Sequence, residues 1–79
     1  MSSSFKKNIA QRYFHQALQL QDGDDAHIIL ILLNHATRLN PRKIAYWEAL
    51  FNIATELEQY EVALKSINYL FKFKKYSNP

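Results

Sequence analysis

The sequence of 79 residues contains no cysteine, one glycine and two prolines. Without cysteine there is no disulfide, no thiolate nucleophile and no cysteine-based zinc site. So few glycines and prolines argue against a β-sheet protein, which needs turn residues about every 8–12 positions. The longest apolar run, residues 28–33, is far shorter than the roughly 18 residues that cross a bilayer. These absences favour a small all-α protein, which we expect to be soluble and cytoplasmic.

The composition that remains is that of one folded domain. Hydrophobic residues make up 48% of the chain and charged residues 22%, a balance typical of a globular protein. The net charge is +3, and basic residues gather near both ends of the chain: Lys6, Lys7 and Arg12, and Lys72, Lys74 and Lys75. We expect a single helical domain over residues 5–76. Residues 1–4 are predicted to be a disordered N-terminus and residues 77–79 a tail.

Apolar residues recur at three- and four-residue steps in four segments. This periodicity predicts helices over residues 5–21, 26–39, about 43–57 and about 60–75. Gly23 is expected to supply the positive φ that ends the first helix, and Asp24 or Asp25 to cap the second. The pattern of the second helix continues until Pro41, which argues against a short buried strand at residues 28–33.

The two halves of the chain repeat each other. Three pairs of residues are separated by 34 positions: Tyr13 and Trp47, Ala26 and Tyr60, and Leu33 and Ile67. The second half also has Leu50 three residues after Trp47, and the small Ala63 three after Tyr60. This pattern resembles the tetratricopeptide repeat, a helix–turn–helix unit of about 34 residues. The resemblance implies two such repeats, residues 10–43 and 44–77, with four antiparallel helices.

The resemblance is degenerate at several positions. The first half keeps Tyr13, the small Ala17 and an ending at Pro41. The departures are residues of a different size or polarity at positions where the family has Leu, Ala, Gly or Pro: Gln16, Ile29, Phe51, Leu70 and Lys75. These departures concern how tightly the helices pack against each other.

Two repeats without a terminal cap are expected to leave apolar surface uncovered. Repeats of this kind usually number three or more and end in a polar helix. Here the last helix is apolar over a wide arc, and we expect Tyr69, Leu70 and Phe73 to form a surface for a partner. The expected partner is a small helical co-chaperone or a second copy of the chain. The alternative is that this helix is an over-hydrophobic part of the core.

In the repeat family the first helix of each unit lines a concave face. The corresponding residues here form the candidate partner-binding groove: Gln11, Phe14, His15, Leu18, Ala45, Glu48, Asn52 and Thr55. Family members that bind the acidic C-termini of chaperones use Lys and Asn in this groove, whereas Glu48 would repel a carboxylate. Phe14 and Leu18 suit instead the apolar face of an amphipathic client helix.

The resemblance therefore implies a protein–protein interaction module, acting as a cytoplasmic chaperone or adaptor. Small repeat proteins of this size resemble bacterial type III secretion chaperones, which hold needle or translocator subunits before protein transport. The alternative function is a structural subunit that self-associates or joins a larger assembly. A third is nucleic-acid binding through the basic and aromatic residues 71–76, although cations near a helix C-terminus also simply favour the helix dipole.

No pattern in the sequence indicates catalysis or a bound cofactor. His27 and His35 are eight positions apart, too far for a pair of metal ligands on adjacent helical turns. The acidic residues at 22–25 lack the glycine and the final Glu of a calcium loop. A single glycine cannot form a glycine-rich phosphate loop. We expect no enzyme, no metal, no cofactor, no small-molecule substrate and no membrane span.

Overall fold

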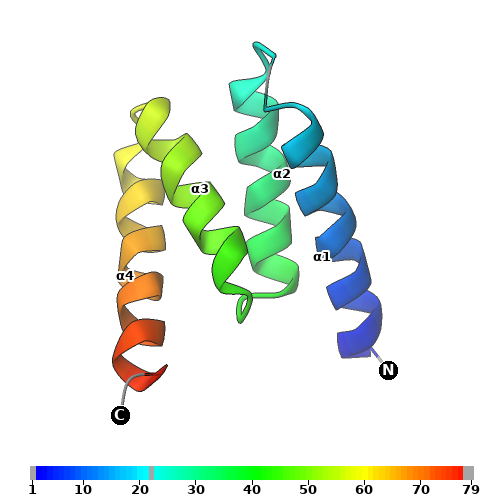
Figure 1. Cartoon of the computed structure of the whole chain (residues 1–79), viewed down its shortest axis with the longest axis vertical. Helices are drawn as coiled ribbons and strands as arrows, with labels where there is room; N and C mark the ends of the chain where they lie inside the picture. The colour runs from blue at the N-terminus through cyan, green and yellow to red at the C-terminus, as the bar shows by residue number, and fades with distance from the viewer. Residues whose placement is uncertain (1, 22, 78–79) are drawn as a thin grey trace.

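The structure is a computed structural model that describes residues 2–21 and 23–77, with the side chains of residues 4–21 and 23–73. It contains four helices, α1 (Ser2–Gln19), α2 (Ala26–Leu39), α3 (Ile44–Glu56) and α4 (Tyr60–Ser77) (Figure 1). None of these described residues belongs to a β-strand. The predicted all-α class and its four helices are confirmed.

The helix boundaries differ from the predicted ones mainly in α1. This helix begins at Ser2, three residues before the predicted start. It ends at Gln19, two residues before the predicted end. Met1, Asp22 and the tail residues 78–79 lie outside the described residues.

The end of α1 does not use a left-handed glycine. The N–H of Leu20 donates to the carbonyl of Ala17 at 3.2 Å and the N–H of Gln21 to that of Leu18 at 3.3 Å, so the last turn tightens into 3₁₀ geometry. Gly23 has no positive φ, which corrects the prediction that it would supply one. Asp25 occupies the N-cap position of α2 as predicted, but its side chain makes no capping hydrogen bond.

Proline ends α2 as the sequence predicts. Asn40 is the C-cap residue and leaves helical geometry, because the residue before a proline is excluded from the α region. Its N–H still donates to the carbonyl of Ala36 at 2.9 Å. The indole Nε1–H of Trp47 donates to the carbonyl of Pro41 at 2.8 Å. Trp47 therefore fixes the α2–α3 turn from the first turn of α3.

A tight two-bond motif ends α3. The N–H of Gln59 donates to the carbonyl of Ala54 at 2.8 Å, and the N–H of Glu58 to that of Thr55 at 3.1 Å. This pair of bonds is the Schellman motif, which requires a left-handed residue after the C-cap. Glu58 takes that conformation, with φ of 59°. The motif reverses the chain directly into α4.

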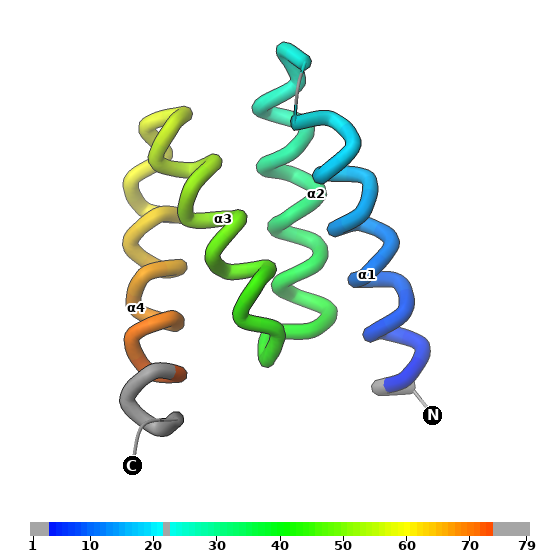
Figure 2. Tube along the Cα trace, viewed as in Figure 1, coloured from blue at the N-terminus to red at the C-terminus, as the bar shows by residue number. Residues whose placement is uncertain are grey.

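The helices form two hairpins placed side by side. α1 packs on α2 and α3 on α4, while α2 and α3 join the two hairpins (Figure 2). The molecule measures 40 × 30 × 18 Å, so it is a flat array of helices. One buried cluster draws on all four helices: Ala17, Ile29, Leu33, Trp47, Leu50, Ile53 and Leu70. A smaller one contains Ala10, Ala36 and Tyr46.

Candidate protein-binding groove

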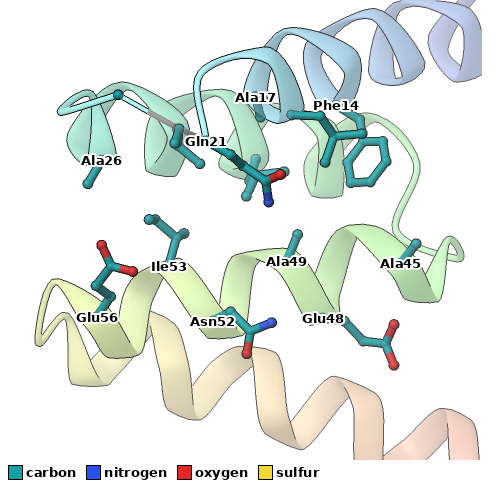
Figure 3. Close-up of a pocket in the computed structure, with 14 residues that line it drawn as sticks. Phe14, Ala17, Gln21, Ala26, Ala45, Glu48, Ala49, Asn52, Ile53 and Glu56 are labelled. Carbon is teal, nitrogen blue, oxygen red and sulfur yellow. The ribbon is translucent and has the colours of Figure 1, made fainter.

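An open groove runs between α1 and α3, with α2 as its floor. Figure 3 shows Phe14 and Gln21 of the first hairpin facing Ala49 and Ile53 of α3 across the gap. The apolar lining residues are Phe14, Ala17, Leu18, Ala26, Ile29, Leu33, Ala45, Ala49 and Ile53. The remaining lining residues are Gln21, Gly23, Glu48, Asn52 and Glu56. We call this surface the α1–α3 groove.

Two small side chains on the α3 wall leave room in the groove. Ala45 and Ala49 stand one helical turn apart on the lining face of α3. The floor residues Ile29 and Leu33 are buried beneath the gap. On the α1 wall, the Phe14 ring packs against Tyr46 with ring centroids 4.8 Å apart, while Leu18 remains exposed. The groove therefore presents apolar surface to a ligand on a floor that belongs to the core.

The charge in the groove has one sign. Glu48 and Glu56 are exposed on α3, two turns apart, and Asn52 lies between them (Figure 3). No Lys, Arg or His is among the lining residues, all of which belong to the described part of the chain. The α3 rim is therefore negative and favours a cationic ligand over an anionic one.

Five of the eight predicted groove residues line the α1–α3 groove: Phe14, Leu18, Ala45, Glu48 and Asn52. Gln11 and His15 do not, and instead line a neighbouring depression that shares Phe14 with the groove and also contains Lys7, Lys43 and Tyr46. Thr55 is also outside the groove, and its hydroxyl donates to the carbonyl of Phe51 at 2.8 Å.

The groove-lining residues that were not predicted come from α1, the α1–α2 turn, α2 and α3. Ala26, Ile29 and Leu33 come from α2, which was not one of the helices expected to line the groove. Ala49 and Ile53 share the lining face of α3 with Ala45 and Glu48. Extending the i, i+3, i+4 spacing from those two predicted residues would have found them.

The predicted second surface belongs largely to the chain's own core. Leu70 is buried, with 7% of its surface exposed. Tyr69 stacks on Trp47 with ring centroids 4.3 Å apart and planes 12° apart. Phe73 is half-buried and packs on Tyr69 at a centroid distance of 5.3 Å. These three side chains therefore turn toward α3, and the exposed apolar residues of α4 are different ones.

The other candidates from the sequence are the histidines, the acidic turn before α2 and the basic segment 71–76. No cluster of three or more His, Asp or Glu residues that could bind a metal occurs in the described part of the chain. His35 stacks on Tyr13 with ring centroids 5.1 Å apart. Burial raises the pKa of the Tyr46 hydroxyl above its ordinary value. Within the basic segment 71–76, the side chains of residues 74–76 lie outside the described ones, while Phe71 is exposed.

None of the described helices combines the length and the hydrophobicity that a membrane span requires. Comparisons of the chain with protein-family models, with curated proteins and with solved structures give no match. The geometry and the charge of the α1–α3 groove therefore remain as the guide to function.

Proposed function

We propose that this protein is a protein–protein interaction module that holds an amphipathic, cationic helix of a client in the α1–α3 groove. The supporting observation is the combination of an apolar floor, an exposed Leu18 and a negative rim formed by Glu48 and Glu56. Such a surface matches a helix with an apolar ridge flanked by Lys or Arg.

The dimensions of the groove favour a short helix as the ligand. The α3 lining runs from Ala45 to Glu56, which spans about 16 Å at a rise of ~1.5 Å per residue. A client helix of about three turns covers this length. Its apolar residues at positions i, i+3, i+4 and i+7 would contact Phe14, Leu18 and Ile53, because a helix buries one stripe of its surface in a groove.

A chaperone or adaptor role follows from this mode of binding. A client helix whose apolar stripe lies in the groove is shielded from association with other apolar surfaces. This is the behaviour expected from the resemblance to type III secretion chaperones, and we propose it for this chain on the basis of size, repeat number and groove character.

The first test is a substitution in the wall of the groove. A fluorescent synthetic peptide with Leu at i, i+3, i+4 and i+7 and Lys beside this stripe is titrated with the protein, and its anisotropy is recorded. We expect Leu18→Asp to weaken binding at least about tenfold, because a carboxylate replaces apolar contact in the centre of the groove. The matched control is Ile31→Asp on α2, which changes another exposed side chain outside the groove.

The second test concerns charge. Glu48→Lys combined with Glu56→Lys should weaken binding of the Lys peptide and strengthen binding of a matched peptide with Glu in place of Lys. Circular dichroism checks that each variant keeps its helix content. If Leu18→Asp binds the peptide as tightly as Ile31→Asp does, the groove is not the binding site and the proposed function is wrong.

A further inference from the structure

An exposed apolar stripe runs along the outer face of α4. It consists of Tyr60, Leu64, Ile67 and Phe71, which are 66%, 60%, 41% and 77% exposed. Their separations of four, three and four positions place them in one line along a helix. None of them lines the α1–α3 groove. We call these four residues the α4 stripe.

The first half of the chain shows what normally covers this face. The residues 34 positions earlier are Ala26, Leu30, Leu33 and Thr37 on α2. Leu33 and Thr37 are buried, at 2% and 4% exposure, and the other two are half-buried. α2 lies between α1 and α3, whereas α4 packs mainly on α3 alone. The α4 stripe is therefore the face on which one more helix would pack.

The accessible surface of the whole chain also indicates that a covering helix is missing. It is 6023 Å², whereas a folded monomer of 9.3 kDa averages about 5,000 Å². The flat array thus leaves more surface in contact with water than a compact monomer of its mass. An additional helix on the α4 stripe would reduce this excess.

The α4 stripe has the symmetry of a self-complementary surface. The spacings between its residues are four, three and four positions, the same from either end of the helix. An aromatic residue lies at each end and two aliphatic residues lie between them. If a second α4 runs antiparallel about a two-fold axis between residues 65 and 66, Tyr60 faces Phe71 of the other copy. Leu64 then faces Ile67 of the other copy. A two-fold interface must have this property, because each residue has to fit its counterpart in both directions.

The charges of α4 are arranged for the same pairing. The exposed Glu58 directly precedes α4, Glu61 lies in its first turn and the exposed Lys72 lies nearer its C-terminal end. The exposed Lys65 lies beside the two-fold axis, off the line of the stripe. Antiparallel pairing brings Glu61 of one copy toward Lys72 of the other, at both ends of the stripe. Parallel pairing would instead bring like charges together, which is unfavourable.

We propose that the α4 stripe binds the same stripe of a second copy of this chain, with the two α4 helices antiparallel. The interface supplies the helix that the second hairpin lacks. The α1–α3 groove lies outside it, so the dimer and the client site are independent and each can fail alone.

The mass in solution is the first test. Light scattering over a concentration series should show a change from 9.3 kDa to twice that mass as concentration rises. Leu64→Asp should shift the midpoint of dimerisation at least about tenfold to higher concentration, because it buries a carboxylate at the centre of the interface. The control Ile31→Asp, at a side chain 54% exposed on α2, should behave as the unchanged protein.

The orientation of the helices is the second test. In the antiparallel dimer the two copies of residue 60 lie about 16 Å apart along the axis, since 11 residues separate positions 60 and 71. A disulfide needs Cα atoms within about 7 Å. Tyr60→Cys alone should therefore form no cross-link under mild oxidation. A mixture of Tyr60→Cys and Phe71→Cys chains should form one. Because the chain has no native cysteine, no other disulfide can form in this assay.

Three results would overturn the proposal. A chain that remains monomeric at about 1 mM has no such interface of useful affinity. A dimer that survives Leu64→Asp but is lost in Ile31→Asp uses a different face. A cross-link between two Tyr60→Cys chains means that the helices are parallel.

Discussion

Glu58 is the residue with the least favourable backbone conformation among the described ones. Its φ of 59° places a side chain with a Cβ in the left-handed region, where L residues other than Gly are about 1–2 kcal/mol less stable. The Schellman bonds that end α3 require this conformation, and the Glu58 side chain is exposed. The turn is therefore strained, because Glu58 has a Cβ at a position where glycine would be unstrained.

We predict that Glu58→Gly raises the free energy of unfolding by about 1 kcal/mol, because glycine adopts this conformation without steric strain. Urea denaturation followed by the fluorescence of Trp47, the single tryptophan, measures the change. The control is Gln59→Gly, since Gln59 has no positive φ and gains nothing from glycine. If both variants are destabilised equally, Glu58 is not strained.

At the scale of elements, the two hairpins solve the same packing problem in opposite ways. In the first, the small Ala17 of α1 is combined with the large Ile29 of α2, and both are buried in one cluster. In the second, 34 positions later, the large Phe51 of α3 is combined with the small Ala63 of α4. Each pair thus contains one large and one small side chain. We predict from this exchange that the large residues at Ile29 and Phe51 are compensated by the small residue of the same hairpin.

This pairing can be tested by exchanging the large and the small side chain within the first hairpin. Ala17→Phe should lower the free energy of unfolding by about 1–3 kcal/mol, because a ring is added opposite the already large Ile29. The double variant Ala17→Phe with Ile29→Ala should recover part of that loss, since it reproduces the arrangement of the second hairpin. A double variant with simply additive losses in urea denaturation would show that the two positions do not share one space.

α4 shows best how tertiary structure selects among apolar residues. Its sequence predicts that Tyr69, Leu70 and Phe73 face a partner, but these residues pack toward α3 while the α4 stripe is exposed. A helix that is apolar on most sides has no single periodic face, so its sequence alone does not define the side that packs. The stacking of Tyr69 on Trp47 fixes which side of α4 packs against α3.

At the scale of the whole molecule, the array is less compact than a typical domain of its length. The radius of gyration is 12.6 Å, compared with about 11.6 Å for a compact domain of this length. Each helix packs mainly on the helices next to it in the sequence, as in stacked repeats, in which each unit contacts only its neighbours. The last helix then has a neighbour on one side only.

The proposed dimer makes a prediction at this scale. The midpoint of thermal unfolding should rise with protein concentration, because association stabilises the folded chain by mass action. Circular dichroism melts over a hundredfold concentration range measure it. Leu64→Asp should remove the dependence, and Ile31→Asp should retain it. A midpoint of the unchanged protein that is independent of concentration contradicts the dimer.

The sequence predicted the four helices and their arrangement in two hairpins. Apolar spacing and Pro41 located all four helices, and α2 matched residue for residue, because these signals act within a few positions along the chain. The ends of α1 and the role of Gly23 were predicted wrongly, since α1 ends in a 3₁₀ turn and Gly23 has no positive φ. For the groove, the spacing on α1 and α3 identified wall residues such as Phe14 and Glu48.

Tertiary structure alone decided which apolar side chains became floor, core or open surface. Ile29 and Ile31 lie in the same apolar run, yet Ile29 is buried beneath the groove and Ile31 is exposed. The physical reason is that burial depends on which neighbouring helix covers each face, and those neighbours are distant in the sequence. The same reason separates the buried Leu70 from the exposed Leu64 on α4, where the covering helix is missing on one side.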